Sequence, residues 1–402
     1  METRGFNLFS SNRLEHLVDA LSRILKKPLS DPFKTETVVV QSRGMARWLS
    51  LEMARRNGVS ALMDYPYPNV FVERHFGRFG AAPAGQGVSS VWDPDILPFK
   101  VFSLLPAFLE THDFPELSGY IGSGNGPLKR YQLARRIGDL FDQYLLFRPD
   151  MIKAWEKGAG DDWQAHLWRM IRNETPDGHK LDLFSAFLEK AEKGEVPPGL
   201  FPERIFIFGI SALPAFYLDV FQAVSRFSDV HLFLLNPCAE YWGDVLSERE
   251  RFRAMKRVQN QNQDRAGLYL SQGNRLLASM GKTGRDFFDL VQARGVEDMA
   301  LFQEPPGHSL LSQIQDDIYQ LRDPADPDYV KRTVAYEDLS VQLHCCHSPL
   351  REVEVLQDRI YAMFDANGDL KPRDVLVMMT DCETFAPLIH SVFGRKPEGR
   401  DM

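Results

Sequence analysis

The hydrophobic positions near the start of the chain alternate between two kinds of spacing. Residues 5–9 and the valines at 38–40 form short apolar runs, which are typical of buried strands. Residues 13–26 and 45–56 instead place their apolar side chains three and four positions apart, as one face of a helix does. The order strand, helix, strand, helix predicts the opening of a parallel sheet in an α/β protein.

The middle of the chain divides into a helical stretch and a return of the sheet pattern. From 97 to 193 the apolar spacing is almost wholly helical, which predicts an all-helical insertion. The proline-rich segment 195–199 ends this stretch. Beyond it, 204–209 and 230–235 predict two more buried strands, with a helix over 213–225 between them.

A second sheet pattern begins after the proline-rich turn at 323–327. Residues 339–345 and 375–379 have the composition of strands, and residues 350–364 have that of a helix. Together they predict a new β-α-β unit. The sequence reaches Met402 with only this one unit built, so we expect the chain to be part of a longer protein.

Composition and charge narrow the class of protein. At 402 residues, 44% of them hydrophobic and 25% charged, the chain fits a globular protein of two or three domains. A net charge of −8 excludes a nonspecific polycation, so any contact with nucleic acid must come from a local patch. Four cysteines argue against a disulfide framework, and we find neither a signal region nor an apolar stretch of transmembrane length. We therefore expect a soluble, cytoplasmic protein without a membrane contact.

The turn after the strand at 38–40 has the shape of a nucleotide site but lacks its chemistry. A P-loop requires G-x-x-x-x-G-K-[ST], because the lysine neutralises phosphate charge and the hydroxyl ligates magnesium. Here Gly44 is followed by Met45 and Ala46. The second candidate strand is followed by Gly209-Ile210-Ser211, without an acidic magnesium ligand. The sequence therefore predicts no ATP hydrolysis and no bound cofactor in this chain.

Two further motifs resemble chemical sites that their context does not support. Gly281-Lys282-Thr283 resembles the end of a P-loop, but Leu276 stands where a glycine is required, so we interpret the match as coincidence. His344-Cys345-Cys346-His347 resembles a metal site, but adjacent ligands on a strand point to opposite faces and no second Cys/His pair accompanies them. We expect a strand end with one or two buried thiols there, and no metal.

Polar side chains gather where the strand at 38–40 ends. Gln41 opens the turn, and Arg43 and Arg47 are four residues apart, so they share one face of the following helix. Crevices at the carboxyl ends of parallel strands bind ligands, and glutamine with arginine suits contact with phosphates or base edges. A solvated surface explains the same residues equally well.

Three aspartates leave a similar choice. Asp139, Asp142 and Asp150 lie in or just after the helix predicted over 133–147. They form either a solvated acidic face or a metal-free set of hydrogen-bond acceptors for nucleic-acid bases.

Several segments, spread from the N-terminus to about residue 394, occur together in one family of proteins. They are 10–14 (Ser-Ser-Asn-Arg-Leu), 40–49 (Val-Gln-Ser-Arg-Gly-Met-Ala-Arg-Trp-Leu), 139–144 (Asp-Leu-Phe-Asp-Gln-Tyr), 147–150 (Phe-Arg-Pro-Asp), 208–214 (Phe-Gly-Ile-Ser-Ala-Leu-Pro), 236–238 (Asn-Pro-Cys), 241–244 (Tyr-Trp-Gly-Asp) and 346–356 (Cys-His-Ser-Pro-Leu-Arg-Glu-Val-Glu-Val-Leu). In this order they resemble RecC, the gamma subunit of bacterial exodeoxyribonuclease V. Family members are much longer, so the chain resembles their N-terminal part.

The resemblance implies the fold of a superfamily-1 helicase that has lost its ATPase motifs. Residues 1–95 and 196–330 would form a first RecA-like domain with a P-loop-like parallel sheet. Residues 96–195 would be its all-helical insertion, and 335–402 the truncated start of a second RecA-like domain. The missing lysine and acid agree with this expectation.

The resemblance also implies a role in double-strand break repair by homologous recombination. A RecC-like chain is a non-catalytic DNA-binding subunit that splits duplex ends, holds RecB-like and RecD-like motor subunits, and scans the 3′ single strand for a hotspot sequence. ATP and magnesium would bind only to the partner subunits. The implied DNA-binding residues are Gln41, Arg43, Arg47, Tyr67, Asp139, Leu140, Asp142, Arg148 and Lys180.

The sequence departs from the family pattern at Arg43 and Arg47, where smaller or neutral polar residues are usual. An arginine pair favours contacts with guanine or phosphate, so we expect a different hotspot sequence or none, which cleavage mapping of the assembled enzyme would reveal. Two other functions compete with this one. The chain could be an assembly scaffold that holds the motor subunits without touching DNA, or an active ATP-dependent helicase or nuclease.

Overall fold

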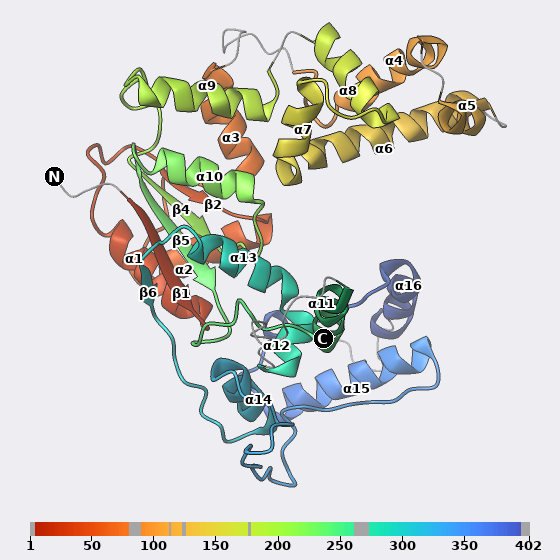
Figure 1. Cartoon of the computed structure of the whole chain (residues 1–402). Coiled ribbons are helices and arrows are strands. Elements are labelled where there is room, and N and C mark those ends of the chain that lie inside the picture. Colours follow the sequence, from red (N-terminus) through yellow and green to blue (C-terminus); the bar gives the residue numbers. More distant parts are fainter. Residues whose placement is uncertain are drawn as a thin grey trace. The chain divides into compact units, whose positions relative to one another are not determined.

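The computed structural model of the chain describes residues 5–79, 90–111, 114–122, 126–175, 178–260 and 273–394 (Figure 1). Contacts within the chain divide it into two compact units. The first contains residues 1–306 and 314–331, and the second contains residues 307–313 and 332–402.

An all-parallel sheet of six strands forms the centre of the first unit, in the order β3-β2-β4-β5-β1-β6. The parallel pairing confirms the predicted α/β class. The sequence missed the two edge strands β3 and β6, which have two and three residues and are too short to show a pattern. The strands are β1 (Phe6–Ser11), β2 (Glu36–Val39), β3 (Met63–Asp64), β4 (Arg204–Phe208), β5 (Asp229–Leu235) and β6 (Asp298–Ala300).

Helices cover both faces of this sheet, so its central strands are buried on both sides. In β4, Ile205 and Ile207 belong to one hydrophobic core, while Phe206 and Phe208 belong to the other. The second core includes α1 (Leu14–Leu25) and α2 (Arg43–Asn57), and the first includes α3 (Pro68–Phe76), α10 (Ala215–Val224) and α13 (Lys282–Gln292). The helices that follow the neighbouring strands β2 and β4 therefore lie on opposite faces. Such an arrangement leaves a crevice between the loops at the carboxyl ends of the two strands.

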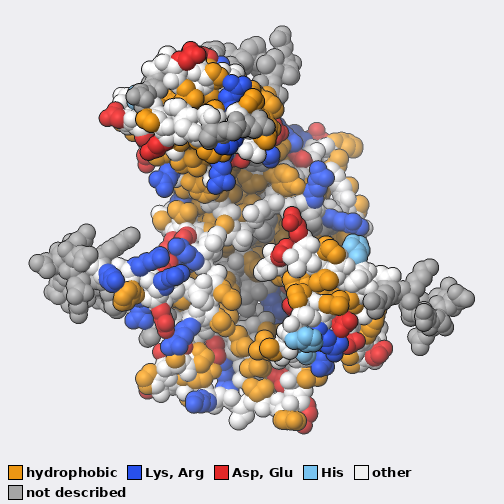
Figure 2. Space-filling model, turned by 90° about the vertical axis from the view of Figure 1, so that its right-hand side faces the viewer, with side chains coloured by type: hydrophobic (Ala, Val, Ile, Leu, Met, Phe, Trp, Pro, Cys, Tyr) orange, Lys and Arg blue, Asp and Glu red, His pale blue; other side chains and the backbone are white. Residues whose placement is uncertain are grey.

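The described residues between 97 and 192 are almost wholly helical, as their spacing predicted. Figure 2 shows hydrophobic side chains exposed on this helical region, with Lys and Arg side chains among them. Its helices are α4 (Leu97–Thr111), α5 (Pro115–Gly122), α6 (Gly126–Phe147), α7 (Pro149–Glu156), α8 (Trp163–Glu174) and α9 (Lys180–Glu192).

α4 packs closely along α6 because a glycine faces a proline at their contact. A Cβ atom on Gly138 would lie 2.9 Å from Cγ of Pro98, closer than real Cβ contacts. The absence of a side chain at Gly138 therefore sets the separation of the two helices.

An ion pair between buried Arg285 and half-buried Glu250 fastens α11 (Glu248–Asn260) to α13. Nη2 of Arg285 lies 2.9 Å from Oε1 of Glu250, and the other Nη nitrogen donates to the carbonyl of Val245. The backbone N–H and hydroxyl of Ser247 also donate to Glu250. The Arg285 bond, more than any other contact, lowers the pKa of Glu250 to about 2. The described residues outside the helical region of 97–192 and the second unit also form η1 (Gly77–Phe79), α11, α12 (Arg275–Met280) and α14 (Leu310–Tyr319).

The second unit has helices but not the two strands predicted for it. It contains α15 (Pro349–Ala366), η3 (Pro372–Asp374) and α16 (Cys382–Phe393). The segments 339–345 and 375–379 pair with no strand in the described part of the chain, so the prediction of a β-α-β unit here is wrong as to its strands. A strand requires a neighbour that exchanges backbone hydrogen bonds with it, and apolar spacing alone does not supply one.

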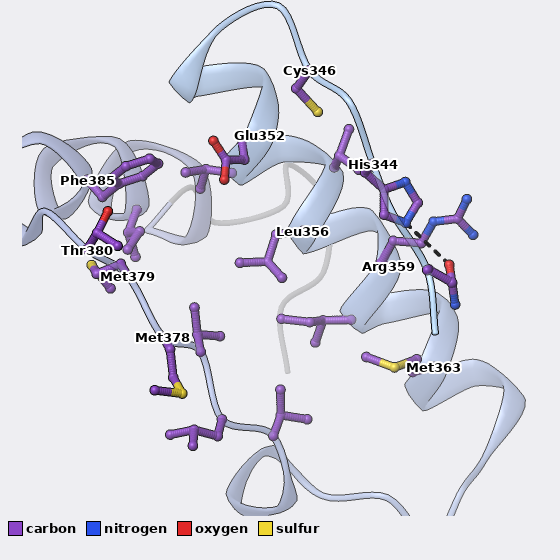
Figure 3. Close-up of a pocket in the computed structure, with 18 residues that line it drawn as sticks. His344, Cys346, Glu352, Leu356, Arg359, Met363, Met378, Met379, Thr380 and Phe385 are labelled. Carbon is purple, nitrogen blue, oxygen red and sulfur yellow. Dashed lines mark hydrogen bonds between the residues drawn. The ribbon is translucent and has the colours of Figure 1, made fainter. Parts of the chain in front are cut away.

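The two segments instead border an apolar cavity of about 610 Å³ against α15 (Figure 3). Leu356 of α15 points into this cavity. Nε2 of His344 lies 3.3 Å from Oε1 of Gln342, at hydrogen-bonding distance. Cys345 is exposed and Cys346 is only half-buried, so the expectation of one or two buried thiols is wrong. Leu343 and Leu376 are 97% and 82% exposed, because no neighbouring strand shields them.

We expect Gly138→Ala to lower the free energy of unfolding by about 1 kcal/mol. The added methyl group would press on Pro98, which costs about 1–3 kcal/mol, whereas the gain in helix propensity is at most about 1 kcal/mol. Urea unfolding measures the change. Gly119→Ala in α5 is the matched control, because the added Cβ would meet nothing within 4 Å. This variant should stabilise the chain through its higher helix propensity. Equal stabilisation by both variants would contradict the close contact of α4 with α6.

We expect Glu250→Gln to destabilise the chain by roughly 3 kcal/mol at neutral pH, since it leaves buried Arg285 without its carboxylate. The native carboxylate has a lowered pKa, so it stabilises the fold above about pH 4.3 and loses this effect as the pH falls toward 2. The variant should therefore lose less stability than the native chain over that range, as measured by thermal unfolding. Glu248→Gln, at a 78% exposed side chain 3.9 Å from Arg275, should behave like the native chain.

Candidate nucleic-acid interface

Two adjoining cavities, of about 950 and 390 Å³, lie at the carboxyl ends of β2 and β4. We call them together the strand-end cleft. It lies in the crevice that forms between two neighbouring parallel strands when the helices that follow them cover opposite faces of the sheet. The residues that line both cavities come from the loops after the two strands and from the end of α6, and they are Gln41, Leu146, Ala212, Leu213 and Pro214.

The smaller cavity brings together four of the side chains singled out from the sequence. Gln41, Tyr67, Asp142 and Lys180 all line it, although they come from four separate elements. Nζ of Lys180, the first residue of α9, lies 2.5 Å from Oδ1 of Asp142 on α6. Both side chains are at least four-fifths buried, so this ion pair joins two helices across the wall of the cavity.

Two titratable residues that line the smaller cavity, Glu73 and Tyr217, were not predicted from the sequence. Burial is the largest cause of the raised pKa of Glu73 on α3, and the charge of Lys180 opposes it. Burial also raises the pKa of Tyr217 on α10, and the carboxylates of Asp142 and Glu73 add to this effect. The only sequence signal for Glu73 was its place one helical turn after Asn69, which also lines the cavity.

The donors and acceptors of the smaller cavity suit hydrogen bonding to a flat polar ligand. Glu73 and Asp142 offer carboxylate acceptors, the amide of Gln41 offers both kinds of group, and Tyr67 and Tyr217 offer hydroxyls. The single lysine is already paired with a carboxylate. The cavity therefore offers contacts for base edges rather than excess positive charge for phosphates.

The larger cavity has a more mixed lining. Phe147, 65% exposed, stands at the end of α6, and Asp150 follows it on α7. Lys282 and Thr283 also line this cavity, at the start of α13. The Gly-Lys-Thr triplet thus lies where one helix follows another, rather than after a strand as a P-loop does.

Five of the predicted residues line neither cavity: Arg43, Arg47, Asp139, Leu140 and Arg148. Arg43 and Arg47 are exposed on α2, and Arg148 is exposed just before α7. Among the described residues, these three arginines form no ion pair. Their contact with DNA stays a prediction. The expected grouping of Gln41 with Arg43 and Arg47 in one crevice is not observed. The reason is that α2 begins at Arg43, and its helical backbone turns both arginine side chains toward solvent.

The turn between β2 and α2 is too short for a phosphate cradle. Three residues separate the strand from the helix, and Oγ of Ser42 accepts a hydrogen bond from the backbone N–H of Met45 at 3.1 Å. The side chain of Met45 packs against Gly209, where a Cβ atom would lie 2.6 Å from its Cε. The helix end that would face a phosphate is thus capped by the chain's own hydroxyl.

The turn after β1 lies beside the carboxyl end of β5, and the helix that follows this turn, α1, belongs to the second core. The side chain of Asn12 donates to and accepts from the backbone of Gln303, at 2.8 and 3.0 Å. The hydroxyl of Ser11 donates to the carbonyl of Leu301 at 2.7 Å. The turn after β1 is therefore bonded to residues 301–303 and contains neither a glycine-rich loop nor a lysine.

One group of potential metal ligands occurs in the described residues: Glu156, His179 and Asp182. The buried His179 is already hydrogen-bonded to both, through Nε2 to Glu156 at 2.8 Å and through Nδ1 to the backbone N–H of Asp182. Arg172 lies 2.7 Å from Asp182. Burial raises the pKa of Glu156, but the His179 bond and other contacts outweigh it and lower the pKa overall. The group forms an ion-pair network that stabilises the helical region.

Among the described helices, none combines the length and the apolar composition needed to cross a lipid bilayer.

Comparison with known proteins supports the sequence resemblance. Residues 6–321 match the family described as RecC, N-terminal domain. The chain is 35% identical to the RecBCD enzyme subunit RecC of Haemophilus influenzae, over 97% of the chain and 39% of the relative. It is 35% identical to that of Escherichia coli, over 98% and 38%, and 30% identical to that of Mycolicibacterium smegmatis, over 97% and 34%. The chain thus spans about two fifths of the length of its first relatives, in which it corresponds to the N-terminal domain, and it belongs to the RecC family.

Proposed function

We propose that the chain is a non-catalytic DNA-binding part of a helicase–nuclease of the RecBCD type, which repairs double-strand breaks by homologous recombination. The strand-end cleft carries this proposal. Gln41, Tyr67, Asp142 and Lys180, expected from the family resemblance to contact DNA, meet there from separate elements of the fold.

In this proposal the 3′ single strand places its bases in the cleft, where the chain scans them for a hotspot sequence. Carboxylates accept hydrogen bonds from the amino groups of cytosine and adenine, and Asp142 and Glu73 are the two carboxylates of the smaller cavity. The phosphates then face outward, within reach of cations such as the exposed Arg43, Arg47 and Arg148.

We assign the sheet to the RecA-like fold of a superfamily-1 helicase that has lost its ATPase. The support is the all-parallel sheet with helices on both faces and the strand-end cleft at the carboxyl ends of β2 and β4. Neither the turn after β1 nor the turn after β2 contains a phosphate-binding lysine. The domain limits expected from the family resemblance, at residues 95, 195, 330 and 335, belong to the same proposal.

The proposed partners are a duplex DNA end with its 3′ strand, and the RecB-like and RecD-like subunits of the complex, all in the cytoplasm. The relatives are named as subunits of the RecBCD enzyme, which supports the assembly. ATP and magnesium would act on the partner subunits. A pure scaffold is the second candidate, favoured by the chain's net charge of −8.

We expect the chain to bind single-stranded oligo-dC more tightly than oligo-dT, and Asp142→Asn to lose most of that difference. The reason is that a carboxylate accepts from the N4 amino group of cytosine, which thymine lacks, and such a contact is worth about 1–3 kcal/mol. Fluorescence anisotropy across a salt series measures both affinities.

Lys193→Gln is the control for surface charge, because Lys193 is exposed at the far end of α9 from Lys180. It should leave the dC preference unchanged. Equal affinity of the native chain for dC and dT would refute base reading in the cleft. No binding at any salt concentration would favour the scaffold.

We expect no saturable binding of a fluorescent ATP analogue to the chain, with or without magnesium. The turn after β2 is capped by Ser42, and the turn after β1 is bonded to residues 301–303. Titration followed by anisotropy is the measurement, with an intact P-loop protein as positive control. Saturable binding that is displaced by unlabelled ATP would overturn the inactive-motor assignment.

A further inference from the structure

Three aromatic rings, two of them exposed and one half-buried, form a cluster where α4 packs on α6, away from the residues that line the strand-end cleft. Phe99 is 59% exposed and Tyr131 is 39% exposed. Their ring centroids are 6.2 Å apart, and that of Phe102 lies 6.3 Å from Tyr131. We call these residues the aromatic platform. Phe102 packs against the first core, whereas the exposed rings of Phe99 and Tyr131 contribute little to it, so burial does not explain those two rings.

Two arginines border the platform. The guanidinium of Arg130 lies 4.1 Å from the ring centroid of Phe102, and its buried Nε has no hydrogen-bond partner. Arg135 is exposed one helical turn after Tyr131 and forms no ion pair with any described residue. The platform therefore combines flat apolar faces with cations that pair with no carboxylate among the described residues.

This combination fits unpaired nucleic acid better than duplex DNA. Aromatic residues and arginine are also enriched in protein interfaces, where carboxylates of the partner would have to neutralise the guanidinium groups beside these rings. In a duplex the bases are stacked inside and only phosphates and groove edges are accessible. A single strand offers both free base faces, which stack on aromatic rings, and phosphates, which bind arginine.

The platform lies on the same side of α6 as the cleft. Leu128, Tyr131, Arg135 and Asp142 recur at spacings of three, four and seven residues, which places them along one face of the helix. At 1.5 Å per residue, Tyr131 lies about 16 Å along the axis from Asp142. A single strand a few nucleotides long spans this distance.

We propose that Phe99 and Tyr131 stack on unpaired bases of single-stranded DNA, while Arg135 and Arg130 hold the adjacent phosphates. The platform is a second contact for the strand, distinct from the base-reading cleft. It extends the proposed function, yet it requires only that single-stranded DNA binds the chain and not that the cleft reads bases.

The test uses the 402-residue chain and an oligo-dT labelled with 5-iododeoxyuridine, which cross-links to stacked aromatic rings on irradiation. We expect mass spectrometry to find the cross-link at Tyr131 or Phe99. The double variant Phe99→Leu/Tyr131→Leu, which keeps apolar bulk but removes the rings, should lose it and bind oligo-dT at least fivefold more weakly, about the value of one stacked base.

Arg135→Gln should lower the slope of log affinity against log salt by about 0.7, as expected for one lost phosphate contact on a single strand. Phe33→Leu is the matched control, because Phe33 is 83% exposed outside the platform, and it should change neither readout.

Unchanged affinity of the double variant, or cross-links confined to the cleft near Tyr67, would overturn the platform while leaving the cleft intact. Cross-links at the platform without any dC preference would support the platform and overturn base reading in the cleft. Thermal unfolding of each variant excludes misfolding as the cause of a loss.

Discussion

The pairing of β2 with β4 is the constraint from which the rest of the first unit follows. Val38 lies beside Phe206 and Val39 beside Ile207, although more than 160 positions separate them in the sequence. Both strands are buried by cores on two faces, so their register is fixed by packing as well as by hydrogen bonds. The intervening chain must leave this ladder and return to it, and it does so as the helical region.

That return brings chemically distinct elements to one end of the sheet. The loops after β2 and β4 meet α6 and α9 there, and the ion pair of Lys180 with Asp142 joins the two helices. Because the lysine is neutralised, the cleft can offer acceptors and hydroxyls without attracting phosphates into it. In the proposed function, this ion pair is the reason why we expect base contacts inside the cleft and phosphate contacts outside it.

The second unit illustrates what happens where such a ladder is missing. Its two apolar segments have the composition of strands, and they flank α15 in the order that a parallel unit requires. Neither has a partner strand in the described part of the chain, so Leu343 and Leu376 stay in contact with solvent. Composition can make a segment competent for a sheet, but a ladder needs two segments.

The sequence by itself determined most elements of the first unit, because the period of apolar residues is a local property: β1, α1, β2 and α2 appear where it predicts them, and so does the helical stretch from 97. The edge strands β3 and β6 are too short to show such a period. The sequence also determined what the turn after β2 lacks, since a missing lysine is visible without coordinates. Only the tertiary structure decided which polar residues meet. It joined Gln41 to Asp142 and Lys180, added Glu73 and Tyr217, and left Arg43 and Arg47 in solvent, because side chains that converge at strand ends are set by the sheet order and the faces that helices cover, neither of which is written in the local pattern.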